Sequence, residues 1–135
     1  MRRQARELAL QILFQIEFAP QISFDDILQV FESSVDKEII DYADVIINGV
    51  NEHKAVIDQK IQSLSRNWKL SRMPLVDINI LRIATFEMCY MSPVLKPNIA
   101  INEAVEIAKK YGSTESGAFI NGILDQIKTE NGKTE

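Results

Sequence analysis

The stretch LVDINILRIATFEMCYM, residues 75–91, carries an apolar side chain at most positions of a helix. Pro74 comes just before it, and proline suits the first turn of a helix because no backbone N–H is needed there. A helix that is apolar on nearly all sides is stable only when other elements cover it. We therefore expect residues 74–91 to form the central, buried helix of the domain.

Apolar residues recur at intervals of three and four on both sides of this stretch, which is typical of amphipathic helices. On the N-terminal side the pattern predicts a first helix that ends before Pro20 and a second that runs from a capping signal at Ser23 to about Ser34. Asp36 can cap a third helix, and Asn51 can cap or kink the chain into a fourth. A connector at residues 66–73 then leads to the central helix.

On the C-terminal side, a sixth helix ends at Gly112, since glycine is typical of helix C-termini. A seventh helix begins in the turn at residues 113–117. Residues 129–135 are polar, and we expect this tail to fray. No segment shows the alternation of a half-buried β-strand. The sequence therefore predicts a single all-α domain over residues 1–135, with about seven helices.

Composition limits the classes of protein to consider. The chain has 135 residues of which 46% are hydrophobic, enough to bury the core of one compact domain. No apolar run reaches the roughly 18 residues that a membrane-spanning helix needs. The single cysteine can form no internal disulfide, which suits a reducing compartment. We expect a cytoplasmic protein without a membrane segment.

Residues for catalysis or metal binding are scarce. His53 and Cys89 are the only histidine and cysteine, so no His/Cys metal cluster can be assembled. GSTESG (112–117) has the spacing of a phosphate-binding loop, but Ala118 and Phe119 stand where that loop needs Lys and Ser/Thr. We therefore expect no catalysis, metal or cofactor. The turn can still attract an anion or simply cap its helix, and Phe119 can stack on a base or belong to the core.

Charge is distributed unevenly along the chain. The net charge is −4, and residues 23–65 carry nine acidic side chains against three lysines. The first six residues, by contrast, contain three arginines on one flank of the first helix: Arg2, Arg3 and Arg6. We call residues 1–6 the arginine arm and expect it to meet a negatively charged partner. Leu10 and Phe14 continue the same flank, so it can also pack on another helix or a second copy, and both a monomer and a homodimer remain open.

Three stretches together closely resemble the NusB family of transcription antitermination factors. They are RRQARELALQILFQIEF (2–18), NWKLSRMPLVDINILRIATFEM (67–88) and INEAVEIAKKYGSTESGAFINGILDQI (101–127). The resemblance implies an all-α fold of two packed three-helix subdomains and no catalysis. It also implies binding to the boxA element of nascent ribosomal RNA transcripts. That binding would occur with NusE, a small-subunit ribosomal protein, in a complex that helps RNA polymerase resist termination.

The resemblance also implies site residues, carried over by position. Arginines supply phosphate contacts, and a polar turn with an aromatic residue can read unstacked bases. The implied RNA surface comprises Arg2, Arg3, Arg6, Gln11, Arg82, Glu115, Ser116 and Phe119. Asp77 matches a position implicated in contact with NusE, where a carboxylate suits a basic protein.

Two positions depart from the family pattern and weaken the implied RNA surface. Gln4 and Ala118 stand where the family often has arginine and lysine, which raises the need for the partner protein. Two other interpretations stay open. One is the NusB-like domain attached to some ribosomal RNA cytosine methyltransferases, which requires a further catalytic domain. The other is a helical interaction module that binds no nucleic acid.

Overall fold

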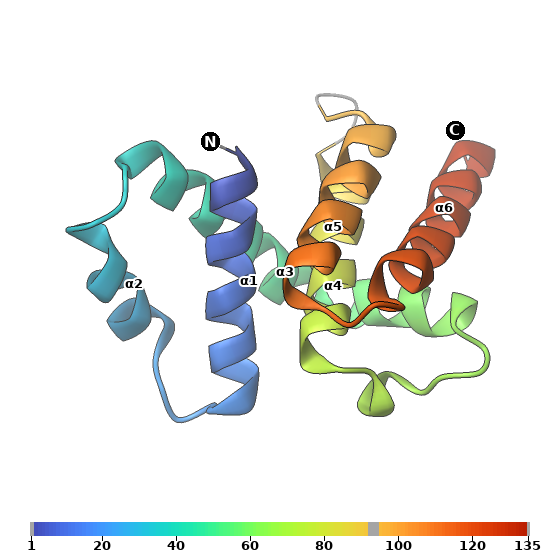
Figure 1. Cartoon of the computed structure of the whole chain (residues 1–135). Coiled ribbons are helices and arrows are strands. Elements are labelled where there is room, and N and C mark those ends of the chain that lie inside the picture. Colours follow the sequence, from blue (N-terminus) through green and yellow to red (C-terminus); the bar gives the residue numbers. More distant parts are fainter. Residues whose placement is uncertain (1, 92–94, 135) are drawn as a thin grey trace.

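The computed structural model describes residues 2–91 and 95–134, so Met1 of the arm and Glu135 of the tail lie outside it. The described residues form six α-helices and one short 3-10 helix, without a β-strand (Figure 1). The elements are α1 (Arg2–Phe18), α2 (Phe24–Glu32), α3 (Lys37–Leu64), η1 (Leu70–Arg72), α4 (Leu75–Tyr90), α5 (Pro97–Tyr111) and α6 (Ser116–Thr134).

Helix α4 is the centre of the molecule, as its sequence predicts. Every residue of α4 from Asp77 to Met88 is buried. Four other helices cover it, because α1, α3, α5 and α6 all pack against α4. Burying each large aliphatic side chain contributes about 1.5–3 kcal/mol, so this element accounts for much of the stability.

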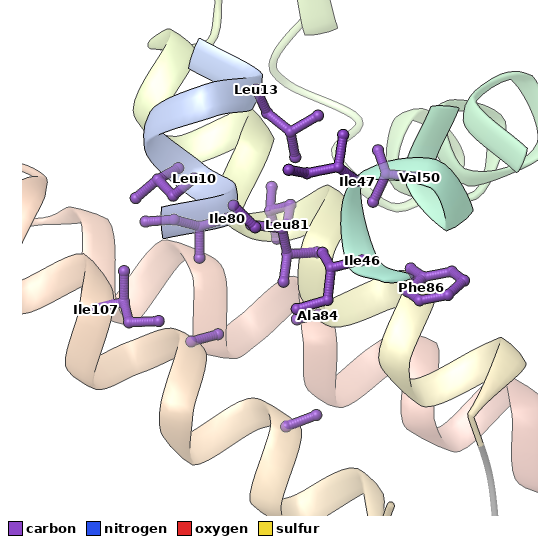
Figure 2. Packing of buried hydrophobic residues seen from close by; sticks show 14 of the residues in the cluster. Leu10, Leu13, Ile46, Ile47, Val50, Ile80, Leu81, Ala84, Phe86 and Ile107 are labelled. Atoms are coloured by element: carbon purple, nitrogen blue, oxygen red, sulfur yellow. The ribbon is translucent and has the colours of Figure 1, made fainter. Parts of the chain in front are cut away.

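The predicted arrangement of two helical subdomains is confirmed. Helices α1, α2 and the first part of α3 lie on one side of the molecule, and α4, α5 and α6 lie on the other (Figure 1). Their shared core forms where α1 and α3 meet α4. Figure 2 shows Leu13 of α1, Ile47 of α3 and Leu81 of α4 converging there, with Ile107 of α5 further away, below Leu10 and Ile80 in this view.

The predicted third and fourth helices are one continuous helix, α3. Asn51 neither caps nor interrupts it, and its side chain is exposed. The apolar stripe that holds α3 against the core continues past this point, from Val50 to Ile57 and Ile61, all of which are buried. The weak preference of asparagine for helix ends, below about 1 kcal/mol, is overridden by packing on both sides of it.

Helix ends agree with the sequence at some points and differ at others. The hydroxyl of Ser23 accepts a hydrogen bond from the N–H of Asp26 at 3.1 Å, so the predicted cap of α2 is confirmed. Gly112 ends α5 as expected. The sequence predicts a frayed tail from Thr129, but α6 continues as a helix to Thr134. No helix among the described residues is both long and apolar enough to cross a membrane.

Candidate nucleic-acid and partner interface

Two residues of the arginine arm point to solvent from the first turn of α1. Arg2 is exposed, and its guanidinium lies 5.0 Å from the centre of the Tyr42 ring, within the range of a cation–π contact. Arg3 donates from Nε to Glu103 of α5 at 2.7 Å, with 53% of its side chain exposed. Both guanidinium groups therefore have a side that a phosphate can approach.

Arg6 does not share this exposure. It is only 2% exposed, and its Nε donates to both carboxylate oxygens of Glu87 on α4 at 2.9 and 3.0 Å. The hydroxyl of Tyr42 donates to the same carboxylate at 2.7 Å. The helical pattern predicts Arg6 outside the core, and the structure corrects this, because α4 and its Glu87 cover that flank of α1. Without RNA, Arg6 links α1 to α4 through Glu87. A contact between Arg6 and RNA stays a prediction.

Arg82 is a second buried arginine, and it lies apart from the arm. Its guanidinium donates to both oxygens of Asp58 on α3, at 2.8 and 3.0 Å, and to Glu17 at the end of α1 at 2.7 Å. Burial lowers the pKa of Arg82, but its bonds with these two carboxylates outweigh that effect and the pKa is raised. The structure therefore gives Arg82 a role in joining α1, α3 and α4, and does not bring it to the arm.

Gln11 is exposed on α1, but on a different side from Arg3. It lies with Gln4 over a hollow between α1 and the turn that joins α2 to α3, which Phe31 and Ser34 also line. Of the residues predicted for RNA binding on α1, the structure thus leaves Arg2, Arg3 and Gln11 accessible.

The turn before α6 is linked to the start of α4 by a chain of hydrogen bonds. The N–H of Ser113 donates to the hydroxyl of Ser116 at 2.9 Å, and that hydroxyl donates to the Asp77 carboxylate at 2.9 Å. Ser116 is 2% and Asp77 6% exposed. Burial raises the pKa of Asp77, against the opposing effect of the Ser116 hydrogen bond. Two residues predicted separately, one for RNA and one for the partner, are therefore in direct contact.

A hollow of about 270 Å³ opens beside this contact. Its walls are mainly apolar and include Phe119 of α6, which is partly buried, together with Met73, Pro74 and the side chain of Trp68. Trp68 is 55% exposed. Two carboxylates, Asp77 and Glu115, complete the lining with Ser113 and Ser116, and none of these described lining residues is cationic. Aromatic walls with carboxylates suit a positively charged side chain.

Trp68 and Phe18 are not among the residues predicted from the sequence to be functional, whereas Phe14 is named above as a possible contact with another helix or a second copy. The rings of Phe14 and Phe18 on α1 are stacked, with centroids 5.9 Å apart, and Phe18 is 73% exposed. Exposed aromatic groups are enriched where proteins meet. The sequence does contain a signal, since a lone tryptophan stands in a connector and a phenylalanine ends an amphipathic helix. Each feature also occurs in connectors and helix ends that have no binding role. The sequence signal for a binding surface is therefore weak until the structure shows that Trp68 and Phe18 are exposed.

Among residues 2–91 and 95–134, no group of three or more His, Cys, Asp and Glu side chains is arranged to hold a metal ion. The chemistry that the exposed groups do support is recognition, through cations, hydrogen-bond acceptors and aromatic faces.

Comparison with known proteins places this arrangement in a family. The profile of the NusB family matches residues 3–129. The transcription antitermination protein NusB of Bdellovibrio bacteriovorus is 62% identical over 126 residues, which cover 93% of each chain. The NusB of Trichlorobacter lovleyi is 47% identical over 130 residues, covering 95% of this chain and 90% of that protein.

Solved structures agree with the sequence matches. A crystal form of T. maritima NusB superposes with a TM-score of 0.88 at 37% identity, covering 96% of this chain and 92% of that one. The fold also matches a chain from a crystal structure of NusB and NusE in complex with double-stranded RNA, with a TM-score of 0.82 at 23% identity and 96% of each chain covered. On the evidence of its sequence and its fold, the chain belongs to the NusB family.

Proposed function

We propose that this chain is a non-catalytic transcription antitermination factor of the cytoplasm. It binds the boxA element of nascent ribosomal RNA together with NusE and helps RNA polymerase resist termination. The observation that carries the proposal is the 62% identity to an antitermination protein over 93% of both chains. The relatives named above match over nearly their whole length, which favours this function over a domain attached to a methyltransferase.

The RNA surface in this proposal is centred on the start of α1. Arg2 and Arg3 supply exposed guanidinium groups for phosphates, and Gln11 adds a donor and an acceptor. Arg6 and Arg82 contribute indirectly in this proposal, by fixing the positions of the helices that carry the surface. Their guanidinium groups are already bound to the carboxylates of Glu87 and Asp58. Glu115 and Phe119 lie at the start of α6 and are proposed to meet bases.

The partner surface in this proposal is the hollow that Asp77 and Trp68 line. A ribosomal protein such as NusE is basic, and an arginine or lysine side chain can place its stem along Trp68 and Met73 and its charge near Asp77. Two features of the described lining support this assignment. Its residues include no cation, and the Asp77 carboxylate accepts its hydrogen bonds from a neutral hydroxyl, that of Ser116.

The arginine arm is tested by measuring RNA binding across a salt series, with and without NusE. Changing both Arg2 and Arg3 to Ala should weaken binding, and the log–log salt slope should fall by roughly 0.7 for each phosphate that is no longer neutralised. Lys37→Ala is the control, because Lys37 is an exposed cation that lies on α3, away from the start of α1, and pairs with Asp41. An unchanged slope in the double variant would remove the arm from the RNA surface. Failure of the unaltered chain to bind RNA even with NusE would defeat the proposed function.

The partner surface is tested with Asp77→Asn, which removes the charge and keeps the shape. A lysine here would have to be buried, so a charge reversal would confuse binding with unfolding. Asparagine can still accept the Ser116 hydrogen bond, and we expect the fold to persist while affinity for NusE falls about tenfold, as for removal of one charge-assisted hydrogen bond. Titration calorimetry with purified NusE measures this. Equal affinities for the two proteins, with equal melting temperatures, would show that Asp77 does not contact the partner.

A further inference from the structure

Two ion pairs cross the line of contact between α1 and α5. Arg3 donates to Glu103 at 2.7 Å, and Lys110 donates to Glu7 at 2.6 Å. The acid is on α5 in the first pair and on α1 in the second, so charges of opposite sign alternate along the contact. We call these four residues the charge seam. It begins at the arginine arm and leads toward the turn before α6.

The carboxylates of the charge seam lie deeper than the cations they bind. The side chains of Arg3 and Lys110 are 53% and 62% exposed, whereas those of Glu103 and Glu7 are 22% and 16% exposed. Burial raises the pKa of Glu7, but hydrogen bonds from Lys110 and Tyr111 outweigh this and lower it, so the group is ionised at neutral pH. The seam therefore presents cations to solvent with carboxylates beneath them.

This arrangement makes the seam electrically neutral. Two cations face two carboxylates, so a phosphate that approaches Arg3 or Lys110 does not meet a bare basic patch. It meets cations whose charge is already compensated at hydrogen-bond distance. A carboxylate and a phosphate oxygen use the same donors on arginine and lysine, with similar geometry.

We propose that the carboxylates of Glu103 and Glu7 occupy the hydrogen-bond donors of Arg3 and Lys110 in the free protein. RNA phosphates displace these carboxylates and bind the same donors when RNA is bound. Lys110 is thereby a further RNA-binding residue, and the two carboxylates limit the affinity for RNA of any sequence. The inference rests on the proposed function, since it requires that the chain bind RNA.

The exchange leaves neither carboxylate without a partner. When Lys110 turns to a phosphate, Glu7 keeps the hydrogen bond that the hydroxyl of Tyr111 donates. When Arg3 turns away, Glu103 keeps Nη1 of Arg6 at 3.9 Å. Exposed ion pairs of this kind are individually weak, so the free-energy cost of exchange is small. The release of counterions from the RNA then favours the bound state.

Glu103→Gln and Glu7→Gln test the proposal, because glutamine keeps an acceptor for the same donor and removes only the charge. We expect each variant to bind RNA about two- to fivefold more tightly at low salt, a gain that matches the removal of one weak competing pair. The gain should shrink as salt rises, since screening weakens the competing ion pair in the unaltered chain. It should be equal for boxA and for a permuted RNA, because phosphate contacts carry no sequence information.

Glu106→Gln is the matched control. It removes one negative charge from the same helix. Glu106 pairs with Lys109, three residues away within α5, and acts on Arg3 only through space, without occupying its hydrogen-bond donors. A general effect of net charge would raise the affinity of all three variants equally. An exchange at the seam raises it for Glu103→Gln and Glu7→Gln and leaves Glu106→Gln close to the unaltered chain.

The measurement is fluorescence anisotropy with short labelled single-stranded boxA and permuted RNAs, in the presence of NusE, after melting curves show that each variant is folded. In a double-mutant cycle, the gain from Glu103→Gln should disappear when Arg3 is already Ala. Equal gains for all three variants, no gain, or weaker binding by Glu103→Gln would each overturn the proposal while leaving RNA binding itself intact. If the unaltered chain bound neither RNA, the proposed function would fail, and this inference with it.

Discussion

Arg6→Ala is expected to lower the free energy of unfolding by about 3–5 kcal/mol, because it leaves a buried carboxylate without its cation. Glu87 is 1% exposed and would keep the hydrogen bond from Tyr42. Burial and the bond to Glu87 raise the pKa of Tyr42 to about 12, so this phenol remains a donor but cannot supply a positive charge. Urea denaturation should show a lower midpoint with an unchanged slope, which marks a decrease in stability without a change in the area exposed on unfolding.

Arg3→Ala is the control for this prediction, since Arg3 is an arginine on the same helix with a half-exposed side chain. Its midpoint should stay near that of the unaltered protein. A second variant separates charge from packing: replacing Arg6 by Met and Glu87 by Leu removes both charges and should recover much of the stability. If Arg6→Ala unfolded at the same urea concentration as the unaltered protein, the ion pair would not hold in solution. Arg6 would then be available for RNA, as its place in the arginine arm indicates.

The role of Arg6 shows what a helical pattern can and cannot predict. A periodic sequence tells which side chains share a flank of α1, and it places Arg2, Arg3 and Arg6 together. It contains no information on which neighbouring helix covers the flank, or where that helix ends. The partner of Arg6 is 81 residues away in the chain. The packing of α4 against α1 is the reason that Arg6 is buried while Arg2 and Arg3 are exposed.

The central helix was predictable for the opposite reason. An apolar surface on all sides can be stable only in the middle of the domain, so the position of α4 followed from its own composition. The break expected at Asn51 is wrong because a local preference of one residue competes with a long apolar stripe on α3. Local signals thus predict α4 and the cap at Ser23 correctly, because tertiary packing does not oppose them there. They mislead at Asn51, because tertiary packing of α3 opposes the local preference.

The candidate site was predictable only in parts. Asp77, Ser116 and Phe119 came from the resemblance to a family, as separate residues for RNA and for a partner. Asp77 and Ser116 are in direct contact although they are 39 residues apart in the chain. That contact depends on how the start of α6 packs against α4. Trp68 enters the same hollow from the connector before η1. The geometry therefore brings three of the residues predicted for RNA, Glu115, Ser116 and Phe119, to the same hollow as the residue predicted for the partner.

One short motif occurs twice in the sequence with different structural consequences. IINGV (46–50) and FINGI (119–123) both place an Asn-Gly pair within a helix. Neither Gly49 nor Gly122 adopts the left-handed backbone conformation, so an alanine is compatible with the backbone at both. Their surroundings differ. A Cβ on Gly49 would overlap the ring of Phe86, whereas a Cβ on Gly122 would meet no atom within 4 Å.

Gly49→Ala is therefore expected to destabilise the protein by about 1–3 kcal/mol or more, since an added methyl group must displace a packed ring. The ring cannot easily yield, because Phe86 is 6% exposed and stacks on Tyr90, whose own ring stacks on His53 at 3.9 Å. Gly122→Ala should instead stabilise the protein by about 0.5–1 kcal/mol, the ordinary gain of alanine over glycine within a helix.

Thermal melting of the two variants checks the opposite signs directly. Combining Gly49→Ala with Phe86→Leu should recover part of the stability, because the smaller side chain leaves room for the added methyl group beside α3. That recovery would show that close approach of α3 and α4, not backbone flexibility, is why glycine stands at position 49. If Gly49→Ala stabilised the protein as much as Gly122→Ala, the two helices would not approach as closely as the structure shows. The Phe86 ring would then have to lie further from Gly49.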